Sequence, residues 1–428
     1  MIKIIGAGFA GCEASYYLAN KGYKIKLYEM RPKKYTEAHK TDKYCELVCS
    51  NSFRSDSLLN GVGLLKEELR LLNSLVMKVS NNHKVEAGSS LAVNRDTFSK
   101  EITDIINNHP NIEVIHDEVI KFNLDDLIIV ATGPLTSDNL IPFIKNITND
   151  DGLNFYDASA PIVSYDSLNL NKIYLKNRYD KGESSYLNCP MNKDEYLNFY
   201  NELIKGEVVI LKDFEKNVFE GCMPIEVMAK RGENTLLFGP LKPVGLENNN
   251  INPYAVVQLR KENNEGSMYN LVGFQTNLKF QEQKRIFRLI PGLQNAEFLR
   301  YGVMHRNTYL NSPKILNNKY QLKNKNNIFF AGQITGVEGY IESASSGLLS
   351  GIYMDKYLKN DNSLLPSETM IQSLANYVSF YNGKDFQPMN ANFGIMKDLD
   401  KRYPKKEKKQ MYSKRSLDKL KEYLNNGY

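Results

Sequence analysis

The sequence predicts an α/β fold, in which a Rossmann-like dinucleotide-binding domain carries an inserted α/β domain. Three observations support this prediction. A short strand, a glycine-rich turn, a helix and a second strand follow one another in residues 1–31. Two more apolar strands that end in glycine-rich turns lie far along the chain, at 124–138 and 326–352. Between them, residues 156–309 mix short apolar runs with charged helical stretches and differ in character from both ends.

The first element is a dinucleotide fingerprint of the form GxGxxG. The apolar strand Ile2–Ile5 is followed by the run GAGFAG, which contains Gly6, Ala7, Gly8 and Gly11. Gly6 allows the tight turn, Gly8 lets the backbone approach a pyrophosphate, and Gly11 permits close packing of the helix on the strand. The helix that follows is expected to point its N-terminus at the phosphates, because that end carries the positive end of the helix dipole.

The second strand of this element supplies an acidic residue. The run CEASYYLANKG is helical in character and stops at Gly22, and the strand YKIKLYEM then ends beside Glu29. Glu29 lies 18 residues after Gly11, where it is placed to accept hydrogen bonds from ribose hydroxyls. Met30 and Arg31 follow directly and are expected to belong to the same cofactor site.

The later glycine-rich elements indicate which cofactor is bound. NAD, FAD and S-adenosylmethionine can all use the N-terminal geometry. The run LDDLIIVATGPLTSD ends a strand with Thr132 and Gly133, and NNIFFAGQITGVEGY ends another with Gly332, Gln333 and Gly336. A strand ending in Ala-Thr-Gly and a late strand–glycine–helix element are typical of large flavoproteins, which need both to complete a site for a long cofactor. The three elements together predict bound FAD.

One helical stretch and three apolar runs between these elements also predict secondary structure. Residues 61–78 have the apolar spacing of one amphipathic helix, which is expected to pack on the sheet. The runs GEVVILK, TLLFGP and YNLVGF have the apolar character of strands and would lie in the inserted domain.

Composition limits the class of protein. Of 428 residues 42% are apolar, and no run approaches the ~20 uninterrupted apolar residues of a membrane span, so a cytoplasmic protein without a membrane partner is expected. Five cysteines, an odd number, predict reduced thiols rather than a disulfide framework. Residues 397–428 hold 11 Lys and Arg against 5 Asp and Glu, which accounts for the whole net charge of +6. That segment fits either a polyanionic partner or a solvated basic tail.

The residues alone leave the cysteine chemistry open. Cys45 and Cys49 would share one face of a helix, a spacing that suits a dithiol working with the flavin, and both could also be buried small residues. The five histidines make no clear paired spacing with a cysteine, so no metal site is predicted. Cys222 lies in FEGCMPIEVMAKRG, where glycine and proline suggest a defined loop and the nearby Lys230 and Arg231 would favour a thiolate.

Twelve sequence segments, spread along the chain, can be compared with known families as one ordered set. In order from residue 2 to residue 394, they are IIGAGFAGCEA, KLYEMRP, ELVCSNSFRSD, LLKEELRLLNSLVM, ATGPLTSD, FEGCMPIEVMAKRG, FGPLKPVGL, VVQLR, LVGFQT, PGLQNAEFLRYGVMHRNTY, AGQITGVEGYIESASSG and FQPMNANFG. In identity and order they resemble the folate- and FAD-dependent RNA uracil-5-methyltransferases. The resemblance implies a FAD-binding domain in two parts, 1–155 and 310–395, an inserted substrate and RNA domain at 156–309, and a basic C-terminal tail at 396–428.

The resemblance also implies a chemistry and its co-substrates. In this family 5,10-methylenetetrahydrofolate supplies carbon at the formaldehyde level, and FAD reduced by NADH or NADPH supplies the hydride that takes this carbon to methyl. Uracil C5 becomes a nucleophile once a thiolate has added to C6. The family's active-site cysteines match Cys49, at the flavin, and Cys222, which activates uracil. Tyr340 in GVEGY matches a tyrosine that stacks near the isoalloxazine.

The chain also departs from the family. A THLKW-like family string reads TNLKF here, with Asn277 and Phe280, so an imidazole that could contact folate or flavin is missing. Ser90 lies in a string that is richer in glycine in the family, and the basic tail has no clear counterpart. The family includes enzymes for the T-loop uridine of tRNA and enzymes for 23S ribosomal RNA. Family frequency favours tRNA, and no obligate protein partner is evident.

Three other interpretations remain at this point. A flavin dithiol oxidoreductase would use Cys45 and Cys49 and need no RNA. An S-adenosylmethionine methyltransferase could use the same N-terminal fold. A flavin-bearing RNA-modification subunit could depend on a second enzyme for its chemistry.

Overall fold

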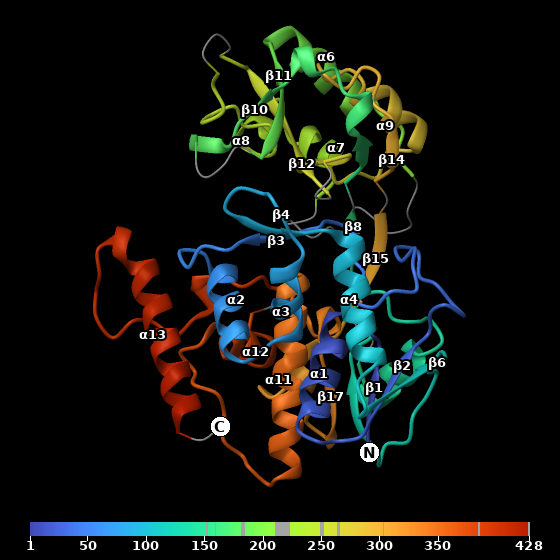
Figure 1. Cartoon of the computed structure of the whole chain (residues 1–428), viewed down its shortest axis with the longest axis vertical. Helices are drawn as coiled ribbons and strands as arrows, with labels where there is room; N and C mark the ends of the chain where they lie inside the picture. The colour runs from blue at the N-terminus through green and yellow to red at the C-terminus, as the bar shows by residue number, and fades with distance from the viewer. Residues whose placement is uncertain are drawn as a thin grey trace.

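The computed structural model places the chain in two stacked lobes (Figure 1). It describes residues 1–150, 153–158, 160–180, 185–209, 223–248, 252–262, 266–302, 304–383 and 386–426. Both ends of the chain lie in the lower lobe, whereas the middle of the chain forms the upper lobe (Figure 1).

The lower lobe is built on a six-stranded sheet with the strand order β16-β17-β7-β1-β2-β6. The strands are β1 (Ile2–Ile5), β2 (Ile25–Glu29), β6 (Ile112–His116), β7 (Leu127–Val130), β16 (Gln321–Leu322) and β17 (Lys325–Phe330). The pairs β1–β2, β1–β7, β2–β6 and β7–β17 are parallel, and only β16 pairs antiparallel, with β17. The late strand β17 therefore pairs with the early strand β7, which brings both ends of the chain into one sheet. The predicted Rossmann-like fold class is confirmed.

Helices cover both faces of this sheet. One face lies under α1 (Phe9–Asn20), α4 (Arg95–Asn107) and α11 (Tyr340–Leu358), whose apolar side chains share a core with Ile4, Leu27 and Ile129. The other face packs on α5 (Ile141–Thr148) and α10 (Ser312–Ile315) through Ile128 and Val130. Strands such as β7 are apolar at every position because both of their faces are buried.

The upper lobe contains a second six-stranded sheet, in which all strand pairs are antiparallel, with the order β10-β11-β12-β13-β9-β14. Its strands are β9 (Ile162–Ser164), β10 (Tyr174–Leu175), β11 (Tyr186–Met191), β12 (Ala255–Lys261), β13 (Met268–Leu271) and β14 (Phe298–Arg300). Its helices are α6 (Lys193–Lys205), α7 (Ile225–Lys230), α8 (Thr235–Phe238) and α9 (Phe280–Phe287). These helices and strands share a separate apolar core, which is the signature of a domain that folds around its own centre.

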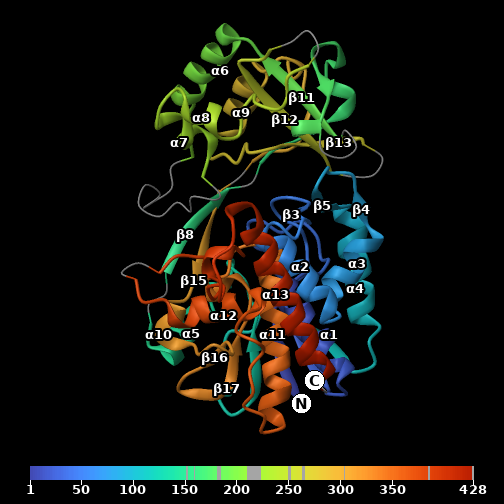
Figure 2. The same ribbon diagram turned by 90° about the vertical axis from the view of Figure 1, so that its left-hand side faces the viewer.

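Two strands connect the lobes. β8 (Leu153–Ala158) and β15 (Met304–Tyr309) pair antiparallel along their whole length and run between the two sheets (Figures 1 and 2). A small sheet of β3 (Ser52–Ser55), β5 (Ser90–Val93) and β4 (Lys84–Val85) lies in the lower lobe, on the side that faces the upper one. The predicted domain boundaries at 155/156 and 309/310 fall in or beside the β8–β15 pair and stay predictions.

The prediction of a single helix over 61–78 is wrong, because two helices form there. α2 (Gly61–Leu71) ends before Asn73, which adopts a left-handed conformation with φ 58°, and α3 (Leu75–Asn82) begins after Ser74. Ser74 accepts a hydrogen bond from Met77 N–H and so caps α3. α2 contacts α11, α12 and the C-terminal helix rather than the main sheet.

The strand-like runs have different outcomes. YNLVGF supplies three of the four residues of β13, as expected, but TLLFGP forms the short helix α8. A four-residue apolar run does not distinguish a buried strand from a helical turn, which explains the wrong assignment. The last residues of GEVVILK lie outside the described part of the chain.

The basic C-terminal segment is an ordered helix. α13 (Lys405–Asn425) packs beside α2, and α12 (Met370–Phe380) lies close to both (Figure 2). Glu68 of α2 connects these three helices. Its carboxylate accepts hydrogen bonds from the N–H groups of Met370 (2.7 Å) and Ile371 (2.8 Å) of α12 and from the Ser416 hydroxyl of α13. Burial raises the pKa of Glu68 to about 7, although these donors act in the opposite direction.

The described ranges also contain short 3₁₀ helices at Tyr165–Ser167, Leu170–Lys172, Arg178–Asp180, Gln333–Thr335 and Phe393–Ile395. Among the helices of the described ranges, none is both long enough and apolar enough to span a membrane.

Candidate cofactor and catalytic site

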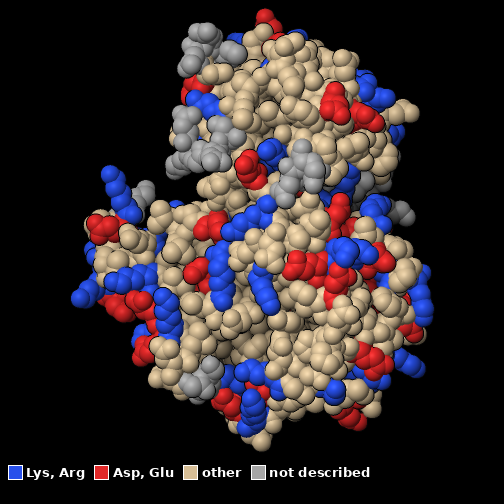
Figure 3. All heavy atoms as spheres, viewed as in Figure 1, with Lys and Arg blue, Asp and Glu red and all other residues tan. Residues whose placement is uncertain are grey.

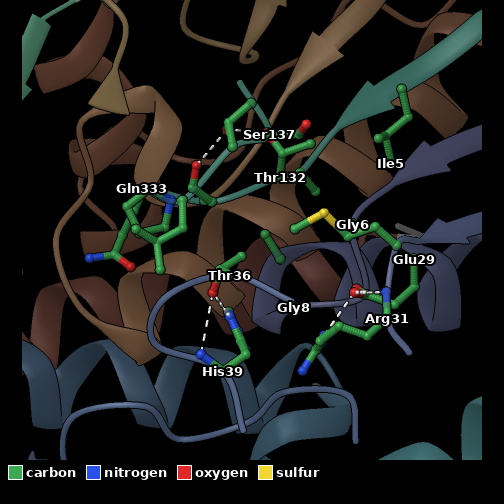
Figure 4. Close-up of a pocket in the computed structure, with 18 of the residues that line it drawn as sticks. Ile5, Gly6, Gly8, Glu29, Arg31, Thr36, His39, Thr132, Ser137 and Gln333 are labelled. Atoms are coloured by element: carbon green, nitrogen blue, oxygen red, sulfur yellow. Dashed lines mark hydrogen bonds and ion pairs between the residues drawn. The ribbon is translucent and has the colours of Figure 1, made fainter. Parts of the chain in front are cut away.

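A deep cleft opens where the parallel strands β1, β7 and β17 end (Figure 4). Crevices at the carboxyl ends of such strands are where open α/β sheets bind ligands. Residues of the N-terminal fingerprint and of the late glycine-rich turn line the same cleft, so it joins the elements that a long cofactor needs.

Most cofactor residues expected from the sequence line this cleft, although they come from both ends of the chain. Those that line it, together with Tyr340, are Gly6, Gly8, Glu29, Met30, Arg31, Thr132, Gly133, Gly332 and Gln333. Figure 4 shows Gly6, Gly8, Glu29, Thr132 and Gln333 around one space. Ala7, Gly11 and Gly336 lie behind the wall, and Cys222 lies outside the described residues.

Each of two glycines in the fingerprint, Gly8 and Gly11, suits its position for a different physical reason. A Cβ on Gly11 would lie 1.8 Å from the Gly6 carbonyl oxygen, so only glycine allows α1 to pack this closely on the β1 turn. A Cβ on Gly8 would meet no protein atom within 4 Å, because this position faces open space. The backbone beside Gly8 is the N-terminus of α1, whose first N–H groups have no partner within the helix. Together these features fit the pyrophosphate of FAD.

Gly336 is required for a different contact. Its φ is 86°, and a Cβ there would lie 2.5 Å from the Phe386 ring. This glycine therefore shapes the turn behind the cleft rather than the wall itself.

Glu29 is already bonded to the protein. Its carboxylate accepts hydrogen bonds from the Ala7 N–H (3.0 Å) and from the Arg31 N–H (3.1 Å) and Nε (2.8 Å). Burial alone would raise the pKa of Glu29, but the bonds and charge of Arg31 outweigh it and hold that pKa below its ordinary value. Glu29 thus stays ionised, and its Oε2, which accepts only from Ala7, keeps a lone pair that a ribose hydroxyl could use.

Arg31 organises the loop that closes one side of the cleft. Its guanidinium donates to the carbonyls of Thr41 (3.2 Å) and Lys43 (2.9 Å) and lies 3.3 Å from the Glu46 carboxylate. This side chain is almost fully buried, so its charge acts on the protein more than on solvent.

Sequence reasoning missed several residues that line the cleft. They include Phe9, Thr36, His39, Glu46, Val48, Glu118, Ser137 and Ser343. The Thr36 hydroxyl lies 2.6 Å from His39 Nδ1, and Figure 4 shows this pair opposite Ser137. Except for Phe9 of α1 and Ser343 of α11, these residues lie in irregular loops, where no helical or strand period marks a side chain as facing a ligand. Only the nearness of Val48 and Glu46 to Cys49 in ELVCSNS gave a hint.

Cys49 lies beside the cleft and is held by Tyr340. The Tyr340 hydroxyl accepts a hydrogen bond from the Cys49 N–H (2.9 Å) and lies 3.2 Å from the Cys49 Sγ. Cys49 itself is partly exposed, unlike the other described cysteines, which are buried. A thiol that is reachable and held at a fixed position suits nucleophilic chemistry.

Tyr340 is fixed in turn by the elements around it. It is the first residue of α11, and its ring stacks on Phe9 at 4.8 Å and meets Phe53 edge-on at 6.0 Å. Burial, followed by the neighbouring Cys49, raises the pKa of Tyr340 well above its usual value. The hydroxyl therefore stays protonated at neutral pH and can donate toward the Cys49 Sγ.

Cys45 does not form a pair with Cys49. Residues 44–49 form turns and bends rather than a helix, so the two side chains do not share a helical face. Cys45 is 1% exposed, and burial followed by its neighbour Cys12 raises the pKa of the Cys45 thiol well above its ordinary value. A buried, protonated thiol is inert, which removes the structural support for a dithiol with Cys49.

The departures in TNLKF lie in the upper lobe. Asn277 is buried: its amide donates to the Val209 carbonyl (2.9 Å) and its N–H donates to Glu226 (2.7 Å), so it connects two segments near α7. Phe280 is 53% exposed and stacks on Tyr301 at 4.8 Å. Ser90 begins β5 and does not line the cleft.

Metal ligands are not grouped in the described part of the chain. No set of three or more His, Cys, Asp or Glu side chains is placed there to hold an ion.

Comparisons with known proteins identify the family. The family described as glucose inhibited division protein A matches residues 1–362. A protein of Acholeplasma laidlawii named methylenetetrahydrofolate–tRNA-(uracil-5-)-methyltransferase TrmFO is 57% identical over 429 aligned positions, covering 100% of both chains. A protein of the same name from Natranaerobius thermophilus is 56% identical, covering 99% of both chains.

A solved structure supports the fold. The crystal structure of Aquifex aeolicus GidA in its form II crystal superposes with a TM-score of 0.67 at 14% identity, covering 88% of this chain and 67% of that one. At this identity the likeness concerns the fold alone.

The alignments also correct one expectation about the tail. The Acholeplasma laidlawii protein aligns with the whole of this chain, so the basic segment that forms α13 does have a counterpart among the relatives. The resemblance inferred from the sequence strings is confirmed, and the chain belongs to the family of methylenetetrahydrofolate–tRNA-(uracil-5-)-methyltransferases.

Proposed function

We propose that the protein methylates C5 of a uridine in tRNA to give 5-methyluridine, with 5,10-methylenetetrahydrofolate as the carbon donor. The observation that carries this proposal is the alignment over the whole chain with proteins named for that reaction. The structure supports it with a reachable thiol, Cys49, held beside a cleft that the expected cofactor residues line.

FAD is the cofactor that we assign to the cleft. Gly6 and Gly8 would hold its pyrophosphate and Glu29 its ribose, while Gly133, Gln333 and other residues at the far wall would hold the remainder. When bound, FAD supplies the hydride that takes the folate carbon from the formaldehyde to the methyl level, and NADH or NADPH replenishes that hydride. The chain's own residues bind, orient and protect this group from solvent.

The nucleophilic steps belong to the two cysteines of the proposal, Cys49 and Cys222. A thiolate that adds to C6 of uracil makes C5 nucleophilic, and after carbon transfer the C5 proton leaves and the thiolate is expelled from C6. The Tyr340 hydroxyl fixes Cys49 within reach of the cleft. Cys222 enters only through the family resemblance, as the residue that activates uracil.

The basic helix α13 is the part of the surface that we assign to the RNA backbone. Exposed Lys and Arg side chains gather at the left edge of Figure 3, where α13 lies in Figure 1, with acidic side chains among them. Lys406, Lys408 and Lys409 occupy the first turns, where cations oppose the helix dipole and repel one another. An arrangement that costs stability locally is expected where it serves binding, and a phosphate backbone would offset the cost.

The RNA target is tested by mapping the product. Total RNA lacking 5-methyluridine is incubated with the purified protein, the folate and NADPH, and tRNA and 23S ribosomal RNA are then digested separately for nucleoside mass spectrometry. We expect 5-methyluridine at one tRNA position. Formation only in 23S ribosomal RNA would overturn the tRNA assignment while leaving the chemistry intact.

A variant series separates the catalytic assignments. Cys49→Ala and Cys222→Ala should each abolish methyl transfer, whereas Cys45→Ala should leave it largely intact, because Cys45 is buried away from the cleft. Loss of activity in Cys45→Ala with a stable fold would revive the dithiol interpretation. The tRNA substrate and the reduced thiols also lead us to propose a cytoplasmic location.

A further inference from the structure

The loop that carries Cys49 accepts hydrogen bonds from side chains of both lobes. From the lower lobe, Arg95 at the start of α4 donates to the Leu47 carbonyl. From the upper lobe, Arg300 at the end of β14 donates to the Val48 carbonyl. Both guanidiniums thus reach the two residues that precede Cys49.

A second set of contacts holds the residues that follow Cys49. Arg260 of β12 donates to the Ser50 hydroxyl (2.7 Å) and to the Asn51 side-chain oxygen (3.2 Å). The Asn51 amide donates back to the carbonyls of Lys261 (3.1 Å) and Glu262 (3.2 Å). The upper lobe therefore contacts the chain on both sides of the thiol.

These contacts concentrate positive charge at the junction. Arg95 is paired with Glu262 at 2.8 Å, and Glu262 lies 4.0 Å from Arg260. Among the described residues Arg300 has no carboxylate partner of this kind. Partial burial and then the neighbouring positive charge of Arg95 lower the pKa of Arg300.

Cys49 directly follows the two residues whose carbonyls these guanidiniums bind. A negative charge on its sulfur would be attracted by both Arg95 and Arg300. Among the described residues, the ionisable groups near it include Tyr340 of α11, whose hydroxyl stays protonated, and Glu262, which follows β12 and is bonded to Arg95. Among the described groups at this junction, three guanidiniums lie near one carboxylate, and an anion at the thiol would offset their repulsion.

We propose that Arg300 of the upper lobe, together with Arg95, is a positioning residue that holds Cys49 as a thiolate. The reactivity of Cys49 then depends on the upper lobe being docked on the lower one. This inference rests on the proposed function for the role of Cys49, but the state of the thiol can be measured without RNA or folate.

The experiment measures the rate of Cys49 alkylation by iodoacetamide as a function of pH, in the full-length protein with its flavin. Tryptic cleavage gives the peptide of residues 44–54, whose fragment ions distinguish Cys49 from the buried Cys45. We expect the midpoint of the pH–rate profile to lie below the usual thiol value and to rise by ~1 pH unit in Arg300→Met, as loss of one nearby charge predicts. Arg300→Lys should restore at least half of this shift, because it keeps the charge.

The matched control is Arg288→Met, which removes a guanidinium of the same lobe that donates to the Ala296 carbonyl and not to the Cys49 loop. Its profile should coincide with that of the parent protein. Flavin absorbance and the thermal midpoint show that each variant is folded, and Arg95→Met provides a second variant expected to shift the profile upward. An unchanged midpoint in folded Arg300→Met, or an equal shift in Arg288→Met or Arg300→Lys, would overturn the proposal. Failure of RNA methylation with a shifted profile would instead count against the proposed function.

Discussion

Removing the hydroxyl of Tyr340 tests how the structure holds its candidate nucleophile. Tyr340→Phe keeps the ring that stacks on Phe9 at 4.8 Å but deletes the oxygen that bonds the Cys49 N–H at 2.9 Å and contacts the Cys49 Sγ at 3.2 Å. A third contact, to the Ser50 N–H, is long at 3.5 Å and adds little. Each of the two good bonds has a net value of ~1 kcal/mol, so the substitution removes ~2 kcal/mol of restraint on the loop.

This loss of restraint energy predicts a lower rate of methyl transfer. If the restraint acts fully in the transition state, ~2 kcal/mol corresponds to a ~30-fold lower kcat, since ~1.4 kcal/mol is tenfold. Flavin content and folding should be nearly unchanged, because the ring contacts remain. The assay is steady-state formation of 5-methyluridine in a tRNA transcript, with flavin absorbance recorded on the same preparation.

A matched variant controls for loss of any tyrosine hydroxyl. Tyr377→Phe removes a hydroxyl that donates to the Gln387 carbonyl at 2.9 Å on the C-terminal side of the lower lobe, outside the cleft. It should leave kcat unchanged. A kcat for Tyr340→Phe within twofold of the parent, with flavin retained, would refute the reasoning that the hydroxyl positions Cys49.

Three further predictions address the cofactor site, stability and RNA binding. Gly8→Ala should give a folded protein that loses flavin, because its Cβ meets no protein atom and would occupy the space assigned to the cofactor. Gly11→Ala should fail to fold stably, because its Cβ would lie 1.8 Å from a carbonyl oxygen. Equal flavin content by absorbance in both variants would contradict this. For Glu68, whose folded pKa is raised to about 7, the folded state binds the proton more tightly, so its contribution to stability is present below pH ~4.5 and is lost as pH rises through 7. Urea denaturation should therefore show a free energy of unfolding that falls by at most ~3 kcal/mol from this group between pH 5 and 8, and a flatter dependence in Glu68→Gln; parallel curves would exclude the group as a source. Replacing Lys406 and Lys409 by Gln should lower the slope of log K against log salt for tRNA by ~1–2 and leave flavin bound, and an unchanged slope would show that α13 does not touch the RNA.

The cofactor fold was predictable because its local signals are strong and agree with one another. Strand, glycine turn and helix occur in order at residues 2–20, and β7 and β17 end in glycine-rich turns that only a shared sheet could bring together. Each local pattern there matches the global fold, which is why short-range reasoning succeeded.

Long-range contacts explain what the sequence did not reveal. The break in 61–78 depends on Asn73 and on the buried Glu13, which accepts hydrogen bonds from Leu75 (3.2 Å) and Val76 (2.8 Å) at the start of α3. The fixed position of Cys49 depends on Tyr340, 291 residues away. Neither partner is marked by spacing or periodicity, so such contacts appear only in three dimensions.

The basic segment shows a different limit. Its charge was visible in the sequence, but its helix and its contact with Glu68 through Ser416 were not. Deleting residues 397–428 would therefore uncover the face of α2 as well as remove charge, and substitution of exposed lysines is the cleaner test.

The central claim is that folate carbon reaches uridine C5 through this single chain. The direct measurement is mass spectrometry of nucleosides from tRNA incubated with the purified protein, NADPH and methylenetetrahydrofolate labelled with ¹³C in its methylene group, with S-adenosylmethionine present unlabelled. The account predicts that every new 5-methyluridine carries the label and that none forms with Cys49→Ala. Unlabelled 5-methyluridine, or labelled product at the parent rate from Cys49→Ala, would contradict it.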